Sequence, residues 1–135
     1  AYSAWVSLFN RRVGDKKRCV ECVNCVLSEN EELLQRLDGF ARELGEGITS
    51  TPFDVRSSNR NDPRLSDVWG TSDGLFSLLA TLYYMRCNLF HGSKDLIQEQ
   101  MRILAPAIEC LKILNDALAQ FFENEYNEYL DNLRQ

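Results

Sequence analysis

The chain's only histidine lies five residues after an arginine, in the segment YMRCNLFHGSKD at positions 84–95. An imidazole titrates close to neutral pH, so His91 can accept or donate a proton under ordinary conditions. The guanidinium group of Arg86 stays charged and can bind phosphate oxygens through two parallel donors. Together the two side chains are suited to general acid–base chemistry at a phosphate, which requires no metal ion.

The spacing of this pair decides whether the two side chains can act together. On a regular helix, side chains five residues apart point about 140° away from each other. Gly92 follows and can adopt the left-handed conformation that ends helices, which would let the chain turn at His91. Ser93 would then begin the next helix, whose N-terminus favours an anion. In the alternative, structural interpretation, His91 caps helix carbonyls and Arg86 pairs with an acidic residue of a neighbouring helix.

Apolar periodicity predicts helices on both sides of this segment. Residues 73–90 are apolar around most of a helix circumference, as expected of a central helix packed on several sides. From Lys16 to Leu44, apolar residues recur every three or four positions, which predicts an amphipathic helix that ends at Gly45. Ser28 and Glu31 could instead form a capping box that divides this helix in two.

Two further helical patterns lie at the ends of the chain. Residues 2–9 predict a short first helix with an aromatic side. A long pattern near the C-terminus has Ser93 as its predicted N-cap, and Pro106 is expected to kink or divide it. Its apolar positions follow steps of three and four and extend through Tyr126 and Tyr129: Ile97, Met101, Leu104, Ile108, Leu111, Leu118 and Phe122, with Asn115 among them.

Residues 45–72 are rich in Gly, Ser, Thr, Asn, Asp and Pro, which predicts one long irregular connection. Asp62 as N-cap, Pro63 as first residue and Gly70 as stop would form one short helix within it. Arg56, Arg60 and Arg64 are spaced four apart and, with Lys94, are candidates for binding RNA. An ordinary solvated loop is the alternative interpretation of the three arginines.

No segment has the two-residue alternation of a strand, and 135 residues are enough for a single core. We therefore predict one all-α domain over residues 1–135, an antiparallel bundle of four to five helices. No apolar run is long enough to span a bilayer and no signal peptide is visible, which favours a cytoplasmic protein without a membrane partner. The net charge of −5 argues against coating nucleic acid through bulk positive charge, so any RNA contact must be local.

Three of the five cysteines form a Cys-x2-Cys-x2-Cys run at Cys19, Cys22 and Cys25. Such spacing can hold zinc or part of an iron–sulfur cluster. A closed zinc site needs four ligands, and no second Cys or His pair lies nearby in the sequence. We therefore favour reduced thiols that pack as small hydrophobic residues, and we expect no metal or cofactor.

The segment RCNLFHG, with an apolar helix before it and another after it, resembles the Arg-x4–6-His motif of HEPN domains. The resemblance implies an all-α bundle and a metal-independent endoribonuclease of the kind found in toxin–antitoxin and abortive-infection defence systems. It implies that Arg86 and His91 are the catalytic pair, with Asn88 assisting and Gly92 forming the turn. It also implies that RNA is cleaved through the ribose 2′-hydroxyl, in a cleft made by two copies of the chain.

The partners that follow from this resemblance are RNA, a second copy of the chain, and a cognate antitoxin or other regulator. Cys87 stands at the position where related motifs usually carry asparagine. The alternative function is therefore a catalytically silent HEPN module that binds a nucleotide or RNA, or that acts as a dimerising adaptor.

Overall fold

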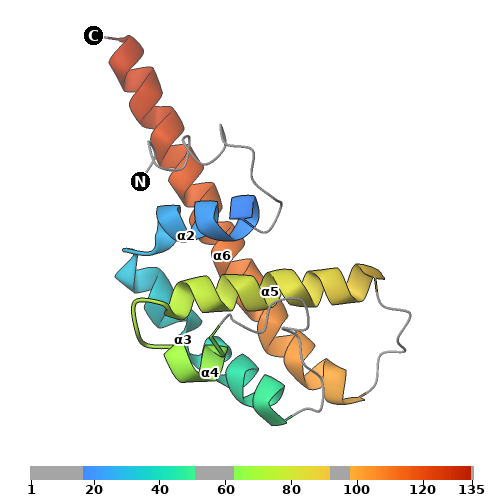
Figure 1. Cartoon of the computed structure of the whole chain (residues 1–135). Helices are drawn as coiled ribbons and strands as arrows, with labels where there is room; N and C mark the ends of the chain where they lie inside the picture. The colour runs from blue at the N-terminus through green and yellow to red at the C-terminus, as the bar shows by residue number, and fades with distance from the viewer. Residues whose placement is uncertain (1–16, 51–62, 92–97, 135) are drawn as a thin grey trace.

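The computed structural model describes residues 17–50, 63–91 and 98–134, and of residues 17–18, 87–91 and 98–100 it describes the backbone alone. These described residues form helices and no strand, which confirms the predicted all-α class (Figure 1). In chain order the elements are η1 (Lys17–Glu21, a π-helical turn), α2 (Cys22–Leu27), α3 (Glu31–Ser50), α4 (Leu65–Val68), α5 (Gly74–His91) and α6 (Gln98–Leu133). The predicted helix at 2–9 and the predicted cap Ser93 lie outside the described residues.

The helices α3 and α6 form an antiparallel pair, and α5 crosses it (Figure 1). Ile103 near the start of α6 lies beside Gly47 near the end of α3, while Arg36 reaches Asp116 further along α6 at 4.0 Å. The core between the elements is closed by fully or nearly fully buried aliphatic side chains. On α3 and α5 these include Leu33, Leu37, Ala41, Leu44, Leu75, Leu78, Leu79 and Leu82.

The described part of the segment predicted as one helix, from Lys17 onward, is divided before α3, because the chain turns between α2 and α3. Asn30 rather than Ser28 caps the second helix: its Oδ1 accepts a hydrogen bond from the backbone N–H of Leu33 at 3.0 Å. An asparagine at this position satisfies one of the free donors of the first turn, which explains why the helix starts there.

The prediction that this helix ends at Gly45 is wrong, because α3 continues to Ser50. A Cβ atom at position 45 would lie 3.3 Å from the backbone nitrogen of Ser66. Gly45 therefore lets the segment of α4 approach closely, and does not end the helix. Thr49 also donates a hydrogen bond to the Gly45 carbonyl inside the last turn, at 2.9 Å.

The connection predicted at 45–72 is consequently shorter and partly helical. A short helix is present as predicted, but α4 starts at Leu65, after Arg64 in an extended conformation, rather than at Pro63. Gly70 has a φ of +94°, the left-handed conformation expected of the predicted stop. Residues 51–62, with Arg56, Arg60 and Asp62, lie outside the described residues.

The last helix, α6, runs unbroken through Pro106 for 36 residues, so the proline does not divide it. Pro106 is among the most deeply buried side chains of the protein. The C-terminal part of α6 extends past the other helices (Figure 1). Within the described parts of the chain, no helix is long and apolar enough to cross a membrane.

Candidate functional site

The helix α5 positions the predicted catalytic pair at its C-terminal end. Nearly every residue from Gly74 to Met85 is buried, including the polar Ser77 and Thr81, and Arg86 is the first exposed residue after this run. The hydroxyls of Ser77 and Thr81 donate to the carbonyls of Pro63 and Ser77 at 3.2 and 2.8 Å. The two buried hydroxyls of α5 therefore each have a hydrogen-bond acceptor. The residues expected to do chemistry lie only in the last turns of this helix.

Arg86 and His91 both belong to α5, whose helical backbone reaches His91. On a regular helix their Cα atoms lie about 9 Å apart and their side chains diverge by about 140°. The structure describes the Arg86 side chain as exposed, whereas Asn88 and His91 are described by their backbone only. Gly92 and Lys94 lie outside the described residues, so the predicted turn after His91 stays a prediction.

Arg64, the remaining predicted RNA-binding residue, is exposed immediately before α4. The adjacent carbonyl of Pro63 accepts the hydrogen bond from Ser77, in the first turn of α5. Ser77 and Arg86 are nine residues apart, which corresponds to about 13 Å along a helix. Arg64 is thus anchored toward the opposite end of α5 from the Arg86–His91 pair.

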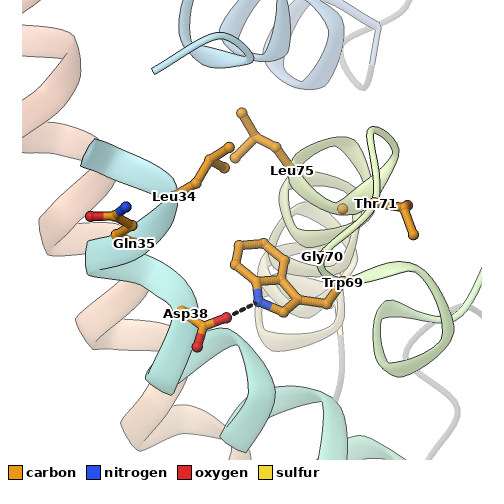
Figure 2. A pocket seen from close by; sticks show the side chains of 8 residues that line it. Leu34, Gln35, Asp38, Trp69, Gly70, Thr71 and Leu75 are labelled. Carbon is orange, nitrogen blue, oxygen red and sulfur yellow. Dashed lines mark hydrogen bonds between the residues drawn. The ribbon is translucent and has the colours of Figure 1, made fainter. Parts of the chain in front are cut away.

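A pocket of about 360 Å³ lies at the N-terminal end of α5, between this helix and α3. Figure 2 shows the Trp69 ring in it, with the indole nitrogen turned toward Asp38 of α3. Trp69 Nε1 donates to Asp38 Oδ1 at 2.8 Å, and Arg42 Nε donates to the same oxygen at 3.0 Å. The apolar part of the pocket is lined by Leu34 and Leu75.

The pKa of Asp38 is lowered from its usual value, first because Trp69 donates to its carboxylate and also because Arg42 donates to it and is positively charged. Partial desolvation of the carboxylate opposes this shift. Asp38 therefore stays ionised at neutral pH and accepts the hydrogen bond that holds Trp69 against α3, while Arg42 donates to it within α3. The contact joins residues 31 positions apart, and no sequence pattern predicts it beyond the isolated tryptophan that follows α4.

The pocket beside Trp69 does not contain the predicted catalytic residues. Gly74, which lines it, precedes Arg86 by twelve residues, about 18 Å along α5. A second pocket, of about 410 Å³, lies between α2, the start of α3 and α6, with Arg36 and Asp116 at its border. The candidate functional site is therefore the C-terminal end of α5.

The cysteine run does not assemble a metal site among the described residues, which contain no group of three or more His, Cys, Asp or Glu side chains able to hold a metal ion. Cys19 is exposed, Cys22 is buried and Cys25 is partly buried, and none of the three forms a disulfide within the described residues. The three side chains thus face different surroundings on η1 and α2.

Compared with protein-family models, with curated proteins and with solved structures, the chain matches none of them.

Proposed function

We propose that this protein is a metal-independent endoribonuclease of the HEPN type, in which Arg86 and His91 act on an RNA phosphate. The observation that carries the proposal is the position of the pair at the end of α5. Arg86 is exposed directly after a buried run that includes Tyr84 and Met85, each 6% exposed. A cation held at the end of a rigid, buried helix is suited to binding a phosphate from solvent.

In the proposed reaction, the imidazole of His91 accepts the proton of a ribose 2′-hydroxyl, and the 2′-oxygen attacks the neighbouring phosphorus. The bond from phosphorus to the 5′-oxygen breaks, and the leaving oxygen takes a proton from a general acid. The products are a 2′,3′-cyclic phosphate and a free 5′-hydroxyl. Arg86 would stabilise the negative charge that develops on the phosphate oxygens.

One histidine per chain cannot be the base and the acid of the same step. A site shared by two copies would supply a second imidazole. The divergence of Arg86 and His91 on one helix supports this arrangement, because a phosphate could then be contacted by side chains of both copies. The proposal accordingly includes a homodimer, a cytoplasmic location where RNA is available, and a regulator that restrains the nuclease in the manner of toxin and defence systems.

Purified protein tests the proposal in buffer that contains EDTA, with single-stranded and structured RNA as substrates. We expect His91→Ala to lower the cleavage rate by about 10²- to 10⁴-fold, and Arg86→Ala by about 10²-fold or more. Arg134→Ala, which removes an exposed arginine at the far end of α6, is the matched control and should cleave like the unaltered protein. The products should carry cyclic phosphate ends.

Intact RNA after prolonged incubation, or equal cleavage by the unaltered protein and His91→Ala, would reject the nuclease. If RNA then binds without being cut and Arg86→Ala weakens the binding, the silent HEPN module is the better description. Cys87, at the usual asparagine position, is the residue that favours this second function. Cys87→Asn would then be expected to restore cleavage.

A further inference from the structure

The helix α6 carries two apolar faces. The core buries one of them, and of the other it covers only Leu104 and Leu118 in part. The inner face packs against α3 and includes Ile103, Ala107, Cys110 and Leu114, which are 0–3% exposed. The other face, here called the outer stripe, is made of Met101, Leu104, Ile108, Leu111, Leu118, Phe122, Tyr126, Tyr129 and Leu133. At about 100° per residue the outer stripe falls within an arc of about 100°, centred roughly 100° from the inner face.

Seven members of the outer stripe are strongly exposed large hydrophobic side chains, from Phe122 at 43% to Leu133 at 65%. With roughly 200 Å² for a fully exposed large side chain, they present on the order of 750 Å² of surface per chain. A stable protein–protein interface buries about 800 Å² per partner. The outer stripe therefore has the size of one half of a complete interface.

We propose that the outer stripe binds a second copy of this chain, with the two α6 helices packed antiparallel around a two-fold axis. The stripe begins at Met101 and ends at Leu133, so its midpoint is residue 117. In the antiparallel register with full overlap, Met101 faces Leu133 of the other copy. The aliphatic half of one stripe, with Ile108 and Leu111, then packs against the aromatic half of the other, with Tyr126 and Phe122.

The charges beside the outer stripe select this register and direction. Lys112 and Glu123 flank the stripe on the same side, and their numbers add to nearly twice 117. In the antiparallel pair, Lys112 of each copy therefore lies beside Glu123 of the other. A parallel pair would instead bring Glu123 of one copy close to Glu125 of the other, because these two residues flank the stripe on opposite sides, and like-charge repulsion disfavours that arrangement.

This self-association does not rest on the proposed RNA cleavage, because the outer stripe and the end of α5 have no residue in common. Its test measures only the state of association. A chain that dimerises through α6 but cuts no RNA would overturn the nuclease alone. A monomeric chain that cuts RNA would overturn this inference and the shared two-copy site, and would leave the Arg86–His91 cleavage chemistry standing.

The first experiment is sedimentation equilibrium of the full chain. At about 100 µM, above the micromolar limit expected for an interface of this size, we expect a dimer. The double variant Ile108→Ser/Leu111→Ser should raise the dissociation constant by about 100-fold or more. Asn127→Ser, an exposed change on α6 outside the outer stripe, is the control and should leave it unchanged. A strictly monomeric chain, or a dimer that the double variant does not weaken, overturns the proposal. The partner of the outer stripe would then be a different protein.

The second experiment tests the register by charge reversal. Lys112→Glu and Glu123→Lys should each weaken the dimer by roughly tenfold, and the double variant should restore it. The two residues lie about 16 Å apart on their own helix, so restoration can arise only between copies. Lys112 also contacts Glu109 of its own chain at 3.3 Å, and circular dichroism of each variant controls for that loss. Failure of the double variant to restore association overturns the antiparallel arrangement.

Discussion

The inner and outer faces of α6 differ in burial and not in the kind of residue they carry. Cys110 and Leu114 on the inner face are 0% and 3% exposed, whereas Ile108 and Leu111 on the outer stripe are 48% and 45% exposed. Both faces repeat apolar residues every three or four positions, as an amphipathic helix does. What separates them is the partner: α3 offers its own apolar side, with Leu37, Ala41 and Leu44, to one face alone.

The comparison shows that periodicity identifies a helix but not the face that forms the core. The pattern predicted for α6 follows the outer stripe, because that stripe holds its larger hydrophobic side chains. The inner face is lined by smaller residues, Ala107 and Cys110 among them, which let α3 approach. The distance between two packed helices depends on the side chains at their contact, and small residues there shorten it.

The largest expected difference between a buried and an exposed position is in the reactivity of cysteine thiols. Burial raises the pKa of the Cys110 thiol to about 12, and the negative charges of Glu109 and Glu43 add to this shift. At pH 8 only about one Cys110 side chain in 10⁴ is then a thiolate, the reactive form. We expect iodoacetamide to modify Cys110 at least about 100-fold more slowly than the exposed Cys19, as measured by mass spectrometry of peptides.

The control for this labelling is the same reaction in denaturant, where Cys110 and Cys19 should be modified at similar rates. Comparable rates in the native protein would mean that the inner face of α6 is open to reagent. That result would contradict the close packing of α6 against α3.

A matched pair of leucine variants compares the two faces energetically. Leu114→Ala removes a side chain from the core and should lower the free energy of unfolding by about 2–5 kcal/mol. Leu111→Ala, one turn earlier on the outer stripe, should cost less than about 1 kcal/mol in the monomer. Urea denaturation at low protein concentration measures both. Equal costs would contradict the assignment of inner and outer faces, and a reversed order would place Leu111 in the core.

Much of the helical framework could be predicted from sequence. The helix predicted over 73–90 corresponds to α5, and the stop at Gly70 is confirmed by its left-handed φ. The end of α3 could not be predicted, because glycine serves both to end a helix and to admit a close neighbour. At Gly45 the neighbour is Ser66, which is distant in sequence.

The candidate site was accessible to sequence reasoning only in part. Arg86 and His91 stand out by residue type and spacing, since either could act on a phosphate. Their relative orientation depends on how the chain leaves α5, which residue types alone do not determine. The Trp69–Asp38 hydrogen bond could not be predicted, because it joins two helices that only the folded chain brings together.

The smallest predicted effect concerns the start of α3, where two polar residues compete for the role of N-cap. Asn30 Oδ1 accepts from the backbone N–H of Leu33 at 3.0 Å, so Asn30→Ala leaves that donor without its partner. Losing an N-cap costs about 1 kcal/mol, which chemical denaturation resolves. Ser28→Ala is the control, because Ser28 has helical backbone angles at the end of α2 and should matter by less than about 0.5 kcal/mol. The opposite order of costs would restore the Ser28–Glu31 capping box.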